Sequence, residues 1–259
     1  MEDNKMLDYI KEVLKNMPID WLNLTTHRLD IYEERLAKTQ FLDLFETLYS
    51  ENNSSQSDLS ELPTAYDYIR LGHPLSCILE WAIADLHNLK SENVISFSSN
   101  TVPVLAILRT NLLANKNTRI LYTDALPSSF DAEIIKDVYG YKFELEKVES
   151  SKTVSEFEGS TILILNQEEI STSSLNSNID FYVNLYSHLG SLLLINGEGN
   201  ESYISDIQHV RRRETIAMTP ANCLVAIKAL TENSTFETNS SNTKTNKASV
   251  LASIKEITE

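Results

Sequence analysis

Side chains able to do covalent or metal chemistry are sparse in this sequence and stand far apart. The five histidines (His27, His73, His87, His188 and His209) are scattered, and none has the spacing to a second ligand that a metal-binding helix needs. Cys77 and Cys223 also lack a ligand partner at metal spacing, and two cysteines cannot build a disulfide framework. We expect both to be small buried apolar residues. The sequence therefore predicts no metal site.

Three further clusters could bind or activate a small molecule. Ser98 and Ser99 end an apolar stretch, but no base can be placed near them, so nothing supports a Ser-His-Asp arrangement. The segment Gly197–Ser202 is similar to the start of a dinucleotide-binding loop, although a serine replaces the third glycine and two glutamates would face the pyrophosphate. We interpret it as a plain turn. The run Arg211–Arg213 could grip a phosphate or an acidic partner, but a solvated helix end is the favoured interpretation.

Charge and hydropathy exclude several classes of function. The 259 residues carry 22 basic and 37 acidic side chains, a net charge of −15, which repels nucleic-acid backbones and suits docking on basic partners. No apolar run approaches the roughly 20 residues of a membrane-spanning helix, and the charged N-terminus differs from a signal peptide. We therefore expect a soluble, reducing, cytoplasmic setting.

Apolar periodicity predicts the elements that must position any site. Helices are predicted at 6–17, 28–49, 74–90, 102–114, 130–139, 179–189 and 218–230, and strands at 94–98, 119–123, 141–148, 161–165 and 192–195. Most of these strands are uninterrupted apolar runs, whereas 141–148 alternates, as an edge strand does. Such strands separated by helices indicate a three-layer α/β fold with a mainly parallel sheet covered on both faces.

Composition divides the chain into four predicted segments. Residues 1–50 form a helical appendage, and 51–63 form a polar linker. Residues 64–231 form the α/β core, and 232–259 form a flexible polar tail with a short amphipathic end. The apolar stripe of the first helix suits either the core of the domain or the surface of a partner, and the sequence leaves both open.

Five short segments, taken in order, carry a family resemblance. They are Tyr68–Pro74 followed by Leu79-Glu80, Ile95–Ser99, His188–Asn196, Glu214–Met218 and Ile227–Leu230. Together they resemble the pyridoxal-phosphate enzymes of fold type I in cysteine and methionine metabolism, the cystathionine synthase and lyase group. The resemblance covers about Thr64 to Thr231 and implies the aminotransferase-like large domain of those enzymes.

The resemblance also implies which cofactor contacts are kept. Tyr68 and Arg70 match the two residues that, in the family, cross the dimer interface to grip the phosphate of the neighbouring subunit. In the family a glycine follows the two serines of the phosphate-binding turn, whereas here Asn100 follows Ser98 and Ser99. The loop at 124–128 has no aromatic residue to stack on the cofactor ring.

Other elements of the family's site are replaced or missing. Asn196 stands where the family has the aspartate that pairs with the ring nitrogen. No lysine lies between Gly197 and Arg213, where the family carries its Schiff-base lysine, and Lys228 matches a non-catalytic lysine of the family. The family's C-terminal domain is also missing. The resemblance thus implies a degenerate relative.

From these departures we expect a pseudoenzyme rather than an enzyme. We predict no catalytic residue, no cofactor and no metal; Tyr68 and Arg70 are relic phosphate contacts whose favoured role is packing and a hydrogen-bonded arm. The predicted function is a scaffold or adaptor subunit in a larger bacterial assembly, such as a secretion complex. Its partners would be proteins that dock on the N-terminal helices and the C-terminal tail, and the resemblance adds a homodimer by analogy.

Two alternatives remain open at this point. The cleft could be repurposed, as an enzyme or a binding protein, for a phosphorylated small molecule held at Tyr68, Arg70 and Ser98/Ser99. Alternatively, the resemblance is accidental and the chain is an unrelated three-layer α/β domain.

Overall fold

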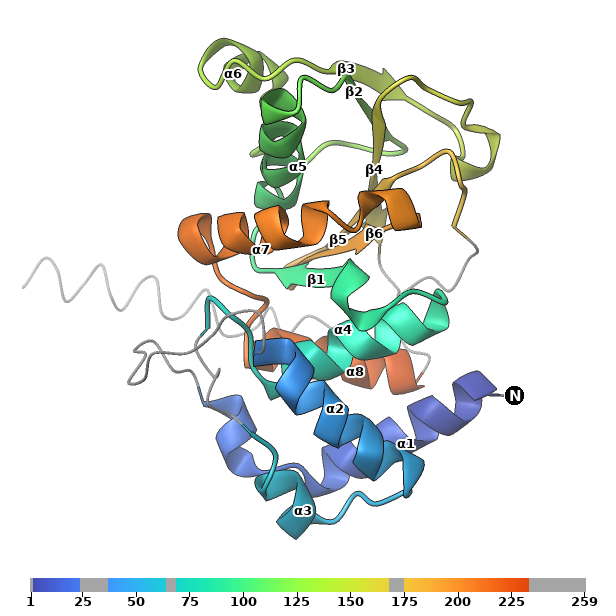
Figure 1. Ribbon diagram of the computed structural model, residues 1–259, viewed down its shortest axis with the longest axis vertical. Coiled ribbons are helices and arrows are strands. Elements are labelled where there is room, and N and C mark those ends of the chain that lie inside the picture. The colour runs from blue at the N-terminus through green and yellow to red at the C-terminus, as the bar shows by residue number, and fades with distance from the viewer. Residues whose placement is uncertain (1, 24–36, 64–68, 168–174, 233–259) are drawn as a thin grey trace, which may run out of the picture.

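The computed structural model describes residues 2–23, 37–63, 69–167 and 175–232 (Figure 1). Within these ranges no helix is both long and apolar enough to cross a membrane. The α-helices are α1 (Glu2–Asn16), α2 (Ala37–Ser50), α3 (Gln56–Ser60), α4 (Pro74–Leu86), α5 (Val102–Leu113), α6 (Ala132–Asp137), α7 (Tyr203–Glu214) and α8 (Pro220–Glu232). The strands are β1 (Val94–Phe97), β2 (Thr118–Tyr122), β3 (Glu144–Lys147), β4 (Ser160–Gln167), β5 (Phe181–Tyr186) and β6 (Gly190–Ile195).

The described strands form one six-stranded sheet in the order β1-β6-β5-β4-β2-β3. β2 pairs in parallel with both β3 and β4, and β4 pairs in parallel with β5. β6 alone runs against its neighbours β1 and β5. The prediction of a mainly parallel sheet is confirmed, and so is β3 as an edge strand with mostly exposed side chains.

Helices cover both faces of the sheet, so the predicted three-layer architecture is confirmed. One face carries a core built with α1, α2, α4 and α8, and the other carries a core built with α5, α6 and α7 (Figure 1). Side chains of each strand alternate between the two cores: on β5, Phe181 and Val183 enter the second core while Tyr182 enters the first. Burial on both faces explains why the strands read as continuous apolar runs.

α4 is the most deeply embedded helix. Its start is defined locally: Pro74 occupies the first turn, His73 accepts from the Ser76 amide at 3.1 Å, and the Ser76 hydroxyl accepts from the His73 amide at 3.0 Å. Every residue from Pro74 to Ala84 is buried. A helix with so little solvent-facing surface can only lie between other elements, and α4 lies between β1 and the helices α2 and α8.

The outer edge of β1 is closed by side chains instead of another strand. The Ser96 amide donates to Glu80 Oε1 at 2.8 Å, and the Ser96 carbonyl accepts from Arg211 Nη1 at 3.1 Å. The Val94 carbonyl accepts from Lys38 Nζ at 3.0 Å, and the Ser91 carbonyl accepts from the same ammonium. Backbone groups that a neighbouring strand would satisfy are thus bonded to α2, α4 and α7.

The three side chains at this edge also form a buried ion triad. Glu80, 2% exposed, lies 2.7 Å from Lys38 Nζ and 3.3 Å from Arg211 Nη1. Burial by itself raises the pKa of Glu80, but the two cations and the hydrogen bonds from Lys38 and Ser96 outweigh it and hold that pKa below its ordinary value. The carboxylate therefore stays ionised inside the protein.

The N-terminal helices pack on the α/β core. Met6, Ile10 and Val13 of α1 are fully buried in the core that contains α4 and α8, and Phe41 and Phe45 of α2 join it. The apolar stripe of the first helix is therefore core, one of the two interpretations left open. α3 lies inside the segment 51–63 and buries Leu59. The four segment boundaries, the docking of a protein partner and the homodimer stay predictions, and the tail lies outside the described residues.

The predicted helix at 179–189 is wrong, because this segment contains β5 in the middle of the sheet. Its aromatic and apolar residues fill both cores with a period of two, and a short apolar run does not distinguish that pattern from a helix. Gly190, interpreted as a helix stop, instead opens β6 with φ +126°, and a Cβ there would overlap the Phe97 carbonyl oxygen. The glycine allows the close approach of β6 to β1.

Replacing Glu80 with alanine tests the edge closure. We expect Glu80→Ala to lower the free energy of unfolding by about 3–5 kcal/mol, because it leaves Lys38 and Arg211 buried without their counter-charge. Urea denaturation at neutral pH measures the change. Glu201→Ala, which removes the exposed ion pair with Lys90, is the matched control and should change stability little. Equal losses in the two variants would contradict the role given to Glu80.

Candidate functional site

The turn after β1 lies at the carboxyl ends of the parallel strands, the edge where open α/β sheets usually bind ligands. The Ser98 amide donates to the Ile216 carbonyl at 3.1 Å, and its hydroxyl lies 3.2 Å from Thr215 Oγ1. Ser99 Oγ accepts from the Thr101 and Val102 amides at 3.3 and 3.2 Å. The Ser99 hydroxyl and the amides of Ser98, Thr101 and Val102 are therefore bonded within the protein, whereas Asn100 Oδ1 is buried without a hydrogen-bond partner.

Arg70 reaches the same edge but is bonded to backbone. Its Nη1 donates to the carbonyl of Arg212, in the last turn of α7, at 3.1 Å. The carbonyl of the neighbouring Ile69 accepts from the Ala217 amide at 2.9 Å. The segment before α4, called the arm below and described from Ile69 to His73, thus lies along the connection from α7 to α8. That connection also contacts Ser98. Tyr68 lies outside the described residues. The structure brings Arg70 and Ser98 to one edge through that connection.

His73 fixes the arm to the other end of the same connection. Its Nδ1 accepts from the Ser76 amide, so Nε2 carries the proton and donates to the Met218 carbonyl at 2.6 Å. The side chain is 1% exposed. Burial lowers the pKa of His73 to about 4, although the Met218 carbonyl acts in the opposite direction. The imidazole is therefore a neutral structural link.

Asn196 does not lie where the resemblance places it. It follows β6, which runs antiparallel, so it lies at the amino ends of β1 and β5 and not beside Ser98. Its side-chain amide donates to the carbonyls of Asn176 and Ile179 at 3.0 and 2.9 Å. The match of Asn196 to the family's aspartate is wrong, because a buried apolar run gives no information on strand direction.

The other candidate residues from the sequence make contacts within the protein that hold the fold together. Within Arg211–Arg213, Arg211 is buried against Glu80 while Arg213 is exposed, so only part of the run is a solvated helix end. The turn after Gly197 lies at the amino edge, where Asn200 Nδ2 donates to Asp180 Oδ1 at 2.9 Å. Cys77 and Cys223 are buried and are not joined in a disulfide. Among the described residues, no group of three or more His, Cys, Asp and Glu side chains could hold a metal.

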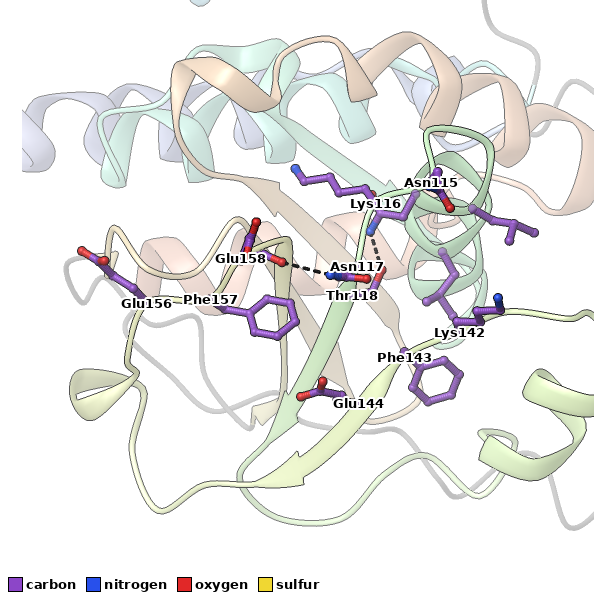
Figure 2. Close-up of a pocket in the computed structure, with 13 residues that line it drawn as sticks. Asn115, Lys116, Asn117, Thr118, Lys142, Phe143, Glu144, Glu156, Phe157 and Glu158 are labelled. Carbon is purple, nitrogen blue, oxygen red and sulfur yellow. Dashed lines mark hydrogen bonds between the residues drawn. The ribbon is translucent and has the colours of Figure 1, made fainter.

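A cavity of about 560 Å³ lies at the opposite, amino edge of the sheet (Figure 2). The end of α5, the start of β2, the start of β3 and the loop before β4 contribute its walls. Thirteen residues line it: Leu108, Asn111, Leu112, Asn115, Lys116, Asn117, Thr118, Lys142, Phe143, Glu144, Glu156, Phe157 and Glu158. It is a hollow that the described part of the chain offers to a small molecule.

Backbone contacts hold the loop before β4 against β2. The Ser160 amide donates to the Asn117 carbonyl at 2.9 Å, and Asn117 Nδ2 donates to the Glu158 carbonyl at 3.5 Å. Gly159 permits this approach, because its φ is +156° and a Cβ would lie 2.5 Å from the Asn117 carbonyl oxygen. Phe157 is therefore held facing the hollow, with the Arg119 guanidinium 4.8 Å from its ring centroid.

The floor of the cavity is buried and its polar groups are bonded. Asn111, 1% exposed, donates to Thr118 Oγ1 at 2.8 Å and accepts from the Tyr203 hydroxyl at 2.5 Å. Leu108 and Phe143 are also buried. Sequence reasoning missed this site. The only signal in the sequence was the alternation of acidic and aromatic residues in Glu156-Phe157-Glu158, followed by a glycine. This pattern does not indicate a site unless the position of β2 beside the loop is known.

A scan against protein-family models and a search of curated proteins both found no match. Solved structures do resemble the chain. Cystathionine gamma-lyase from yeast is 14% identical, with 86% of this chain and 62% of that one covered and a TM-score of 0.46. MetB from Corynebacterium glutamicum is 14% identical, with coverages of 66% and 54% and a TM-score of 0.44. O-acetylhomoserine sulfhydrylase of Wolinella succinogenes is 12% identical, with coverages of 62% and 62% and a TM-score of 0.38.

The likeness is one of fold. The chain spans between 54% and 62% of the length of these three proteins. The predicted scaffold or adaptor function is corrected by this comparison: the lyase and the sulfhydrylase are enzymes, and neither the similar structures nor the described residues show a scaffold role.

The neutral His73 predicts a specific pH dependence of stability. The unfolded chain takes up a proton near the ordinary histidine pKa of 6.5 and the folded chain only near 4, so acidification favours unfolding. Between pH 7 and pH 5 we expect this residue alone to lower the free energy of unfolding by about 2 kcal/mol. Urea denaturation across that range should show the loss reduced in His73→Asn, which keeps a capping side chain.

His209→Asn serves as the control, because the His209 side chain is exposed. The free energy of unfolding of this variant should decrease on acidification as much as that of the wild type. A His73→Asn profile that runs parallel to the wild-type profile would contradict the assignment of a neutral, buried imidazole.

Proposed function

We propose that this chain is a small-molecule-binding protein whose ligand site is the cavity at the amino edge of the sheet (Figure 2). The observation that carries the proposal is the cavity itself, a hollow of about 560 Å³. Ligand pockets commonly measure roughly 300–1,000 Å³ and combine apolar walls with a few fixed polar groups. Leu108, Phe143 and Phe157 provide such walls here, and Asn111 and Thr118 provide the polar floor.

Preformed walls support the proposal. Asn111 links the end of α5 to β2 through Thr118 and to α7 through Tyr203. Phe143 packs edge-on against Phe130 of the second core, with ring centroids 6.3 Å apart. Because these groups are bonded and packed within the protein, a ligand would enter without first ordering them, which lowers the free-energy cost of binding.

We assign no role to pyridoxal phosphate, because the described groups of the carboxyl edge do not fit it. A phosphate there would need the amides at the start of α5, but those of Thr101 and Val102 are bonded to Ser99 Oγ, and Pro103 has none. Asn196 lies at the other edge of the sheet. The same contacts weaken the alternative of a phosphorylated ligand at Arg70 and Ser98.

We propose binding without turnover at the cavity. Among its thirteen lining residues there is no histidine, cysteine or serine, and the one hydroxyl, that of Thr118, accepts from Asn111 Nδ2 at 2.8 Å. Lys142 and the glutamates are exposed at the rim.

Two neighbouring leucines of α5 provide a matched test. Leu112 lines the cavity, whereas Leu113 is 78% exposed and does not. We expect Leu112→Trp to fill part of the hollow and weaken the binding of uncharged aromatic probes, 2-phenylethanol and indole, about tenfold. Leu113→Trp adds the same bulk outside and should leave binding unchanged. Backbone amide shifts of Thr118 and Glu158 in a heteronuclear NMR titration report the binding.

The proposal fails if the wild-type amides do not shift with either probe. It also fails if both tryptophan variants bind the probes as the wild type does, because the probes would then occupy some other place. Thermal unfolding of the two variants confirms that each is folded under the conditions of the titration.

A further inference from the structure

Building on the proposed function, we infer that the cavity selects small organic cations, namely protonated amines with an apolar body. The inference combines the shape of the hollow with the charges at its rim. Each contribution can be traced to named side chains, and each can be removed separately.

The apolar body has a defined place in the cavity. Leu108 and Phe143 form a buried wall, and Leu112 and Phe157 extend it toward the opening. The Phe157 ring already has a guanidinium 4.8 Å from its centroid, and the Phe143 ring has Lys136 Nζ at 4.7 Å. Both rings are therefore in contact with cations of the protein itself, and we assign them to the apolar part of the ligand.

The rim carries three carboxylates that form no ion pair with a described residue. Among the described residues, no cation forms an ion pair with Glu144, Glu156 or Glu158. Lys116 also lines the cavity, but its Nζ lies 5.4 Å from the Tyr203 ring centroid. Carboxylates without a partner at the mouth of an apolar hollow favour a ligand that brings its own positive charge.

The position of the other rim lysine agrees with this polarity. Figure 2 shows Glu156 and Glu158 on one side of the hollow and Lys142 on the opposite side. Lys142 therefore does not neutralise the acidic side of the rim. An amine whose apolar body lies between Phe143 and Phe157 would place its ammonium group toward the 156–158 loop.

The competing explanation is general attraction by a chain of net charge −15. Such attraction acts over the whole surface and does not require the hollow. It can be separated from the inferred site by comparing glutamates inside and outside the rim. Glu149 is exposed and does not line the cavity, so Glu149→Gln removes the same charge elsewhere.

The test titrates the protein with 2-phenylethylamine, 2-phenylethanol and phenylacetate, which share an aromatic body and differ in charge. Measured by NMR at low salt, the amine should bind about tenfold more tightly than the alcohol, and phenylacetate more weakly than both. Glu156→Gln with Glu158→Gln should bring the amine to the affinity of the alcohol. Glu149→Gln should keep the preference within twofold, and added salt should reduce it.

Each outcome separates the inference from the proposed function. If the three probes bind equally and Leu112→Trp weakens them all, the cavity binds small molecules but has no preference for amines, which overturns the inference alone. If Glu149→Gln reduces the preference as much as the rim variants do, general attraction explains the result and the inference fails. If no probe shifts the amides of Thr118 and Glu158, both the inference and the proposed function fail.

Discussion

The carboxylate of Glu80 accepts a backbone hydrogen bond that a neighbouring strand would otherwise accept at the outer side of β1. β1 ends the sheet on one side, and its outward backbone groups would cost free energy if they were buried without partners. Glu80 accepts from the Ser96 amide, while its two counter-ions, Lys38 and Arg211, donate to carbonyls of the same strand. Three helices from distant parts of the chain are thereby tied to one strand edge. A buried ion triad is weak evidence for stability in general, but here each charge also closes a backbone group that no other described residue satisfies.

The closure at β1 also affects the carboxyl ends of the strands. Arg211 also donates to the Leu71 carbonyl, so the arm before α4 and the end of α7 are drawn together over the end of β1. The connection from α7 to α8 then lies between that arm and Ser98, and its carbonyls accept from His73 and the Ser98 amide, while Arg70 donates to a carbonyl in the last turn of α7. Arg70, His73 and the Ser98 amide are consequently bonded within the protein. At the amino edge, described side chains at the starts of β2 and β3 line a cavity.

The sequence predicted the three layers of helices and strands better than it predicted the direction of individual strands. Runs such as 94–98 and 161–165 were recognisable as strands because burial on both faces makes them mostly apolar. The same property conceals direction, so β6 was not recognised as antiparallel and Asn196 was assigned to the wrong edge. β5 was mistaken for a helix because its aromatic residues suit both periods over six residues. The cavity was beyond prediction because it depends on Gly159 lying against Asn117, a contact between segments about forty residues apart that no local pattern encodes.

The scaffold prediction rested on the loss of the family's motif residues, with the acidic surface, the helical appendage and the polar tail as docking elements. Two features of the structure bear on it. The apolar stripe of α1, a face offered for partners, is buried against α4 and α8. The edge opposite the expected cleft carries a hollow with bonded polar groups at its floor and uncompensated carboxylates at its rim. Because fold does not fix function, the residues that matter are those that surround a space a ligand can enter, and in this chain they lie at the end of α5, the start of β3 and the loop before β4.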